Sequence, residues 1–243
     1  MSFVNEFFDA LSSLVNVREM YLELNNLLVI PNMAFRNMTN GQLLRLEKLR
    51  IISRKLTQIS SYAFYELPYL RWIKIHSSVG LKRISAHSFD ISQPSNHRLT
   101  IDLRSNQLTV GSFELDAFHQ VRRPIHLELS HNNLTTIPRE MFERFLSLDQ
   151  QNEIQLADNP LECDCSMHWI IKDRPIYINQ VLNAICDDFA EVWRLDDNAF
   201  RKCIQDMQYM PRLIFRNSAN SNNSRRLLQH LLLFPIVLQI VLL

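Results

Sequence analysis

A pattern of apolar residues around a single asparagine recurs along most of the chain, and it is clearest between His126 and Phe142. Leu127 and Leu129 alternate with polar residues there, as in a short strand that has one buried face. Asn132 follows in a turn, and an apolar return segment ends at Phe142. One such unit cannot bury its own apolar face, so the pattern predicts stacked copies on both sides.

Copies of the unit occur on both sides, and together they indicate the class of repeat. Aligned on their strands, the units follow one another at intervals of 24 to 29 residues. This period, and the order of strand, asparagine, apolar return, proline and phenylalanine, are those of the leucine-rich repeat. We therefore predict an α/β solenoid, a leucine-rich-repeat horseshoe with short parallel strands on its concave face. The six units begin at Val17, Leu46, Leu70, Arg98, Pro124 and Gln151.

The asparagine of the repeat has a mechanical role in this prediction. Backbone groups that leave the strand point inward and need partners, and an amide side chain can donate and accept at once. Stacked asparagines should therefore form a ladder, although ordinary turn asparagines are the alternative. Arg54 and Ser78 replace the asparagine in the second and third units, where we expect irregular geometry. The predicted ladder consists of Asn25, Asn106, Asn132 and Asn159.

The composition excludes several functional classes. The chain has 243 residues, a formal charge of +1 and three glycines, which lie far apart. No G-x-G-x-x-G or Walker A loop can form, and the near-neutral charge argues against nucleic-acid binding. His126 and His131 are five residues apart, but this register places both on the surface. Since no nucleophile, base and orienting residue form a set, we predict no enzyme activity, no cofactor and no metal site.

All four cysteines follow the last repeat, where a solenoid needs a lid over its open apolar edge. Four cysteines allow three disulfide pairings, and spacing alone does not choose between them. A zinc site and free thiols are the alternatives, but a C-x-C start with wide later spacing fits zinc poorly. The cysteines are Cys163, Cys165, Cys186 and Cys203.

The segment 159–172, NPLECDCSMHWIIK, closely resembles the C-terminal cysteine cap of extracellular leucine-rich-repeat proteins. In that family the first cysteine pairs with the third and the second with the fourth. The resemblance therefore implies a disulfide-stapled cap in an oxidising compartment, with Trp169 in its core. The implied pairs are Cys163–Cys186 and Cys165–Cys203.

A narrower resemblance covers the last repeats and the cap. The run from Trp169 to Cys203 resembles the arthropod proteins named Oplophorus-luciferin 2-monooxygenase non-catalytic subunit-like. They share irregular repeats, a C-D-C cap with a downstream tryptophan, and a phenylalanine–basic pair before the last cysteine, here Phe200 to Lys202. This resemblance implies a non-catalytic subunit and no active site.

The two ends of the chain carry further predictions. The first 17 residues lack the basic and apolar regions of a signal peptide, and Phe8 fits the last position of a preceding repeat. We expect a fragment that lacks upstream repeats, with a cytosolic protein carrying reduced cysteines as the alternative. We divide the chain into repeats (1–161), cap (162–204), polar linker (205–226) and hydrophobic tail (227–243).

The tail favours a glycosylphosphatidylinositol anchor signal, because small and polar residues precede a terminal apolar run. Ser218, Ala219 and Asn220 are the candidate attachment residues. A transmembrane helix and a soluble amphipathic tail are the alternatives. In a secreted chain Asn37, Asn133 and Asn222 would be glycosylation sites, and the exposed turn makes Asn133 the best of them.

Side chains that alternate with the buried leucines should point out of the sheet, which makes this face the candidate binding surface. Exposed Tyr21 and Trp72 beside basic side chains form a mixture enriched in protein-contact hot spots. A merely solvated sheet face is the alternative. The predicted binding residues are Tyr21, Arg50, Trp72, Lys74, His76, Asp102, Arg104, His126 and Glu128.

These observations predict an extracellular protein-recognition module of the adhesion or receptor type, held at the cell surface by its tail. The partner would be a protein bound on the concave face. A secreted non-catalytic subunit that stabilises an enzyme partner is the alternative. The basic second unit could instead meet an acidic glycan or a membrane surface. Its cations are Arg45, Lys48, Arg50, Arg54 and Lys55.

Overall fold

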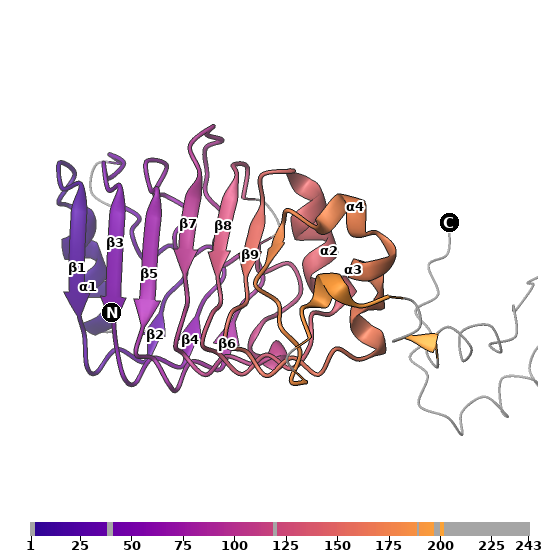
Figure 1. The fold of residues 1–243 in the computed structure, drawn as a ribbon. Helices are drawn as coiled ribbons and strands as arrows, with labels where there is room; N and C mark the ends of the chain where they lie inside the picture. The colour runs from indigo at the N-terminus through magenta and orange to yellow at the C-terminus, as the bar shows by residue number, and fades with distance from the viewer. Residues whose placement is uncertain (1–2, 38–40, 119–120, 189, 197–199, 202–243) are drawn as a thin grey trace, which may run out of the picture. The chain divides into compact units, whose positions relative to one another are not determined.

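Each repeat contributes one short strand to a long parallel sheet, which we call the main sheet (Figure 1). Among the described residues its order is β1-β3-β5-β7-β8-β9-β10, and every neighbouring pair is parallel. The cap therefore adds a strand, β10, that the sequence did not predict. The strands are β1 (Glu19–Glu23), β3 (Lys48–Ile52), β5 (Trp72–His76), β7 (Leu99–Asp102), β8 (Ile125–Glu128), β9 (Glu153–Gln155) and β10 (Val181–Leu182).

The computed structural model describes residues 3–37, 41–118, 121–188, 190–196 and 200–201. They belong to one compact unit, Met1–Cys203, while a second unit comprises Ile204–Leu243. The predicted linker, tail, anchor residues and Asn222 thus lie outside the described residues. In the described part of the chain, no helix is both long enough and apolar enough to cross a membrane.

A second, smaller sheet is formed by the return segments. Its strands β2 (Val29–Ile30), β4 (Gln58–Ile59) and β6 (Arg83–Ile84) are parallel and lie in that order. A bridge between Ile84 and Phe113 continues the same pattern into the next repeat. These strands are short because only the buried isoleucine of each return segment must reach the core.

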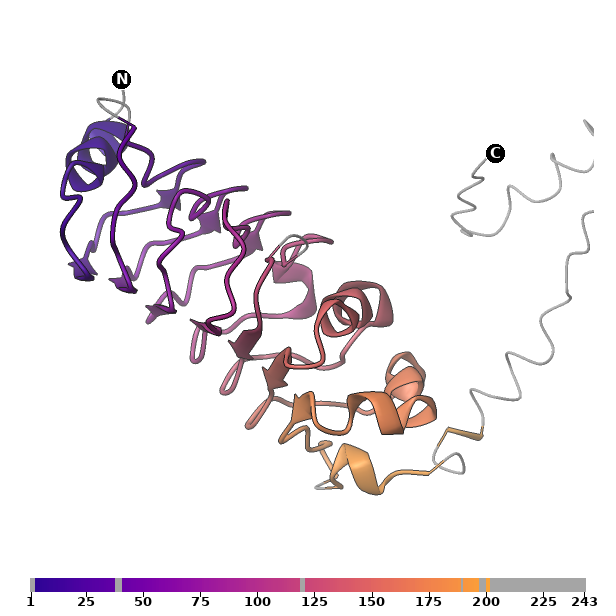
Figure 2. The same ribbon diagram turned by 90° about the horizontal axis from the view of Figure 1, so that it is seen from above.

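Helices lie at both ends of the stack. Figure 2 shows α1 (Phe3–Ser12) on the side away from the main sheet, where a return segment would lie. Toward the other end, α2 lies between β8 and β9 in the chain, and α3 and α4 follow β9 (Figure 1). Their bounds are α2 (Arg139–Leu148), α3 (His168–Lys172) and α4 (Arg174–Tyr177), with 3-10 turns η1 (Val110–Ser112), η2 (Cys165–Met167) and η3 (Val192–Arg194).

A column of phenylalanine rings runs through the return side of the solenoid. The rings of Phe64 and Phe89 stack at 5.5 Å, and those of Phe89 and Phe118 do the same. Phe35 continues the column toward the N-terminal end, and its ring lies 5.4 Å from that of Phe8. Phe8 therefore occupies the predicted position of a repeat phenylalanine, although it belongs to α1. Such offset aromatic contacts add to the burial of each ring.

Three of the four predicted asparagines form the ladder. Asn132 Oδ1 accepts the backbone N–H groups of Asn106 and Leu108, both at 3.0 Å. Asn159 Oδ1 accepts the N–H of Leu134 at 3.0 Å in the same way. The Nδ2 group of each ladder asparagine donates to carbonyls of its own repeat and of the preceding one. One side chain per repeat therefore satisfies two successive turns.

Asn25 is a correction to the predicted ladder, because its side chain is exposed. In the first two repeats the turn is closed differently. The buried hydroxyl of Ser53 donates to the carbonyl of Leu27 at 2.8 Å, one residue before the exposed Arg54. Ser78 meets the ladder through its backbone, since its N–H donates to Asn106 Oδ1 at 3.0 Å. The strands β3 and β5 are regular, so the expected irregularity is confined to the turns.

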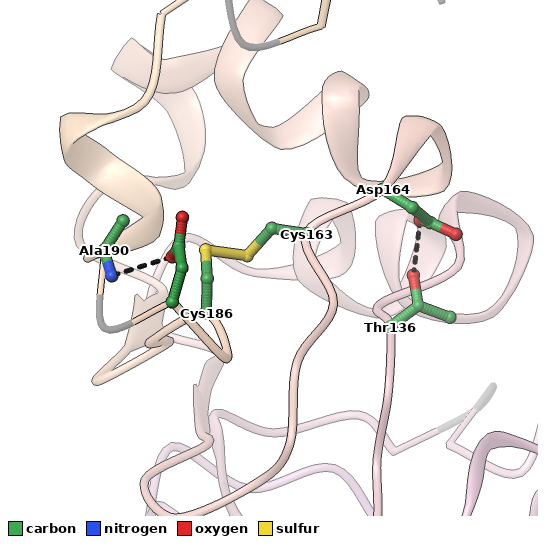
Figure 3. The surroundings of a disulfide bond; sticks show 6 residues. Thr136, Cys163, Asp164, Cys186 and Ala190 are labelled. Atoms are coloured by element: carbon green, nitrogen blue, oxygen red, sulfur yellow. Dashed lines mark hydrogen bonds between the residues drawn. A yellow bond between two sulfur atoms is a disulfide. The ribbon is translucent and has the colours of Figure 1, made fainter.

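The cap closes on the last repeat through one described disulfide and a buried indole. Cys163 and Cys186 are bonded, as the resemblance implied (Figure 3). Cys165 is also disulfide-bonded, and its expected partner Cys203 lies outside the described residues. The Trp169 side chain is buried, and its Nε1 donates to the carbonyl of Ile137 at 2.9 Å. The predicted core role of Trp169 is thus confirmed.

Candidate binding face on the main sheet

Outward side chains of the main sheet form lateral rows because all its strands are parallel and in register. In β1 exposed residues alternate with buried ones along the whole strand, as predicted. The register then places outward residues of successive strands side by side. We call the middle row the central row and the surface as a whole the sheet face. The central row is Tyr21, Arg50, Lys74, Asp102, Glu128 and Gln155.

Tyr21 and Arg50 form a stacked pair at one end of the central row. The Arg50 guanidinium carbon lies 5.0 Å from the centroid of the Tyr21 ring, within the range of a cation–π contact. Tyr21 is nevertheless 55% exposed. Among the described residues no carboxylate lies within ion-pair distance of Arg50. The pair therefore presents an aromatic ring and a cation without a paired acid.

His76 holds the Arg50 side chain in place. The Nε of Arg50 donates to Nε2 of His76 at 2.9 Å, while Nδ1 of His76 contacts the Ser77 hydroxyl at 3.1 Å. Burial lowers the pKa of His76, and the charges of Arg50 and Lys74 lower it further. A neutral imidazole with its proton on Nδ1 accepts from Arg50 and donates to Ser77, so the contacts fit this form.

Asp102 lies in the central row, as predicted, but it is not available as a contact residue. Its side chain is only 1% exposed, because Lys74 and Arg104 lie over it. Lys74 Nζ is 3.1 Å from Oδ2, and Arg104 donates through Nε at 2.9 Å and Nη2 at 3.0 Å. Burial raises the pKa of Asp102, but the hydrogen bonds from Arg104 and Lys74 outweigh it and the net pKa is lowered.

Glu128 is a second correction of the same kind. Its side chain is buried, and Oε1 accepts the backbone N–H of Ser130 at 2.9 Å. Asp102 makes the equivalent contact one repeat earlier, with the N–H of Arg104 at 3.3 Å. Both carboxylates thus close the turn after their own strand. The two carboxylates are buried beneath the sheet face, whereas the Arg104 side chain that covers Asp102 is exposed.

The row at the N-terminal ends of the strands is partly occupied by internal ion pairs. Lys48 Nζ lies 2.8 Å from Glu19, and His126 Nδ1 lies 3.1 Å from Glu153. Arg98 binds the same Glu153 through both Nη atoms, at 2.9 and 3.2 Å. The local sequence does not reveal the contact between Arg98 and Glu153, because these residues are 55 residues apart and meet only in the solenoid.

Trp72 is a half-buried residue of that row, and it lies diagonally next to Arg50 across the β3–β5 pair. Diagonal neighbours on one sheet face are within reach of aromatic and long side chains. Tyr21, Arg50 and Trp72 therefore form one group, which we call the Tyr21–Trp72 cluster. The structure brings these three predicted residues together, along with His76 and Lys74. His126 and Glu128 lie on the other half of the face.

The described part of the chain holds no group of three histidine, cysteine or acidic side chains that could bind a metal ion. The two histidines that were considered as metal ligands contact different acidic residues. His126 faces Glu153, and the exposed His131 lies 3.4 Å from Asp158.

The predicted glycosylation sites differ in accessibility. Asn133 is exposed in the turn after the ladder. Asn37 is buried, and its Nδ2 donates to the carbonyl of Ser12 at 3.2 Å. A glycan on that nitrogen would require the side chain to leave its buried position and this hydrogen bond, so the structure argues against the prediction at Asn37.

Comparison with known proteins places this geometry in a family. Short parallel strands, an asparagine ladder and a phenylalanine column define a leucine-rich-repeat solenoid. The model of the BspA type leucine-rich repeat region matches six copies across residues 29–157, more than half of the chain. The protein therefore belongs to the BspA type leucine-rich-repeat family.

The individual proteins that resemble this chain share less than 30% sequence identity with it. Leucine-rich repeat-containing protein 3 of Danio rerio is 27% identical over 114 residues, which are 44% of this chain and 40% of that protein. The chain thus spans less than half the length of this curated relative. The crystal structure of human 5T4 (Wnt-activated inhibitory factor 1, trophoblast glycoprotein) matches with 18% identity and a TM-score of 0.35. That match covers 75% of this chain and 86% of the other. Leucine-rich-repeat domains generally bind protein partners and are typically not enzymes.

Proposed function

We propose that this chain is an extracellular recognition module that binds a protein partner through the Tyr21–Trp72 cluster of the sheet face. The observation that carries the proposal is the Arg50 side chain, a cation that is stacked on an exposed ring and has no paired acid in the described part of the chain. Tyrosine, tryptophan and arginine are the residues most enriched at binding hot spots.

Rigidity is the second support for the proposal. His76 fixes Arg50 through a hydrogen bond, and β1, β3 and β5 fix the backbone beneath the cluster. A partner that binds a preorganised surface loses less free energy to side-chain ordering. The Asp102 network adds to this support, because it holds Lys74 and Arg104 beside the cluster.

The proposed location outside the cell rests on the disulfide-bonded cap. Disulfides such as Cys163–Cys186 form and persist in oxidising compartments. Attachment to the cell surface by a lipid on the C-terminal tail is part of the same proposal. Phosphatidylinositol-specific phospholipase C should release the full chain from intact cells that express it behind a working signal peptide. Protein already in the medium before treatment would instead favour the secreted non-catalytic subunit.

Site-specific photocrosslinking tests the binding proposal. A benzoylphenylalanine replaces Tyr21 in one full-length variant and Leu28 in another. These residues belong to the same repeat and are 55% and 54% exposed, but Leu28 lies outside the main sheet. The proposal expects a discrete protein adduct from position 21 and none from position 28. Adducts of equal yield at both positions, or only at position 28, would contradict it.

A further inference from the structure

A buried arginine links three successive repeats at the side of the main sheet where the strands begin. Arg123 is 4% exposed and precedes β8 by two residues. Its Nη1 donates to the carbonyl of Leu70 at 2.8 Å. Its Nη2 donates to the carbonyls of Pro68 and Gln93, both at 3.0 Å. The guanidinium is therefore fixed in place by backbone acceptors of two earlier repeats.

Among the described residues, the charge of Arg123 has no acidic partner. In the described part of the chain no carboxylate forms an ion pair with it, and its Nε has no hydrogen-bond partner. Burial lowers the pKa of the guanidinium, and no neighbouring acid opposes this effect. A buried cation without a counter-charge is unfavourable, and it leaves a positive potential in the space beside it.

A cavity of about 370 Å³ lies beside this guanidinium, between the segments that lead into β5 and β7. The exposed side chains of Arg71 and His97 line it, together with Tyr69. The acid on its wall is Glu47, which already pairs with Arg18 at 3.1 Å. The lining is thus cationic, with a fixed charge at Arg123 and an exposed guanidinium at Arg71.

We propose that this cavity binds an oxoanion, carried as a sulfate, phosphate or carboxylate group on a small ligand. Arg71 would bind the group through its planar fork of donors, which matches the geometry of such anions. Arg123 would act through its charge from the floor of the site, with its own hydrogen bonds retained. Since Arg71 directly precedes Trp72, the bound group would lie at the rim of the sheet face. This oxoanion site does not depend on the function proposed above for the sheet face.

A second cavity, of about 600 Å³, provides the control. It shares Ser95 and Arg123 with the first cavity, but Arg122 and Asp149 line it in place of Arg71 and His97. Arg122 is exposed, as Arg71 is. Arg71→Ala and Arg122→Ala therefore remove the same charge from neighbouring cavities, and neither alters the core.

The experiment measures the melting temperature of the full chain as sodium sulfate, phosphate or acetate replaces sodium chloride at constant ionic strength. Excluded anions stabilise proteins in a linear manner, so only the saturable part of the rise reports a site. We expect a saturable rise with at least one anion, a roughly tenfold weaker apparent affinity in Arg71→Ala, and no change in Arg122→Ala. The anion with the highest affinity identifies the chemical group. Absence of a saturable rise, or equal affinity in wild type and Arg71→Ala, would overturn the proposal.

Discussion

Asn132 Oδ1 lies 3.0 Å from the backbone nitrogen of Asn106 and accepts its N–H, so a side chain of one repeat closes the turn of the repeat before it. Asn132→Ala leaves the buried N–H groups of Asn106 and Leu108 without a partner. We expect the free energy of unfolding to fall by about 3 kcal/mol. Urea unfolding followed by circular dichroism measures this change.

The control for this prediction is Asn25→Ala. Asn25 occupies the same position in the first repeat, but its side chain is exposed. We expect its effect to stay within about 0.5 kcal/mol. Similar losses for the two variants would mean that the ladder does not carry the stability that its hydrogen bonds indicate.

The sequence was sufficient to predict the repeats, because strand alternation and repeat length depend on local residue types. Leu127 and Leu129 are buried as predicted, and Phe8 packs on Phe35. The predicted ladder is present where the residue before the asparagine has a positive φ in the structure, as His131 has before Asn132. Nothing in the local sequence distinguishes the exposed Asn25, since the turn there is closed by Ser53 from the next repeat.

The Asp102 carboxylate should make the stability of the protein depend on pH. Its folded-state pKa is lowered, so its contribution is complete above the ordinary aspartate pKa of about 3.9 and is lost as the pH falls through the folded value. At pH 7 we expect Asp102→Asn to lower the free energy of unfolding by about 2 kcal/mol. Below pH 4 the difference from wild type should shrink.

Denaturant unfolding between pH 3 and pH 7 measures this dependence on both proteins. Asp9→Asn, at an exposed position of α1, controls for the removal of one negative charge. The difference in free energy of unfolding between wild type and Asp102→Asn could instead stay constant down to pH 3. That result would show that the ionised Lys74–Asp102–Arg104 network is not the source of the difference.

We expect Asn133 to carry a glycan and Asn37 to carry none. When the full chain is secreted from animal cells, Asn133→Gln should remove one glycan, because the side chain is exposed in a turn. Asn37→Gln should leave the electrophoretic mobility unchanged, since its amide is buried. Mobility before and after treatment with peptide N-glycosidase F measures both. A shift in Asn37→Gln alone would contradict the structure at this position.

Less of the candidate site than of the fold could be predicted from the sequence. Alternation places Asp102 and Glu128 on the sheet face, and they do lie there. It does not show that Lys74 and Arg104 cover Asp102, because these contacts depend on the length and direction of side chains from β5 and from the turn after β7. Arg98 and Glu153 were missed for a related reason, since their contact spans the strand β8 between them.

The disulfide pairing of the cap could be predicted only from the resemblance to a family. Spacing alone leaves three pairings of the four cysteines open, whereas the family pattern implied Cys163–Cys186. The strand β10 was missed because Val181 and Leu182 are too short a run to stand out as a strand. They form one only because β9 offers an open parallel edge.

The central claim is that a protein partner binds the Tyr21–Trp72 cluster. Its most direct test is the affinity of the full chain for the protein that crosslinks at position 21. We expect Arg50→Ala with Trp72→Ala to weaken binding by at least about tenfold, since each side chain is a hot-spot type. Lys82→Ala, an exposed cation outside the main sheet, should bind as wild type does. Unchanged affinity of the double variant, with an unfolding curve like that of the wild type, would contradict the account.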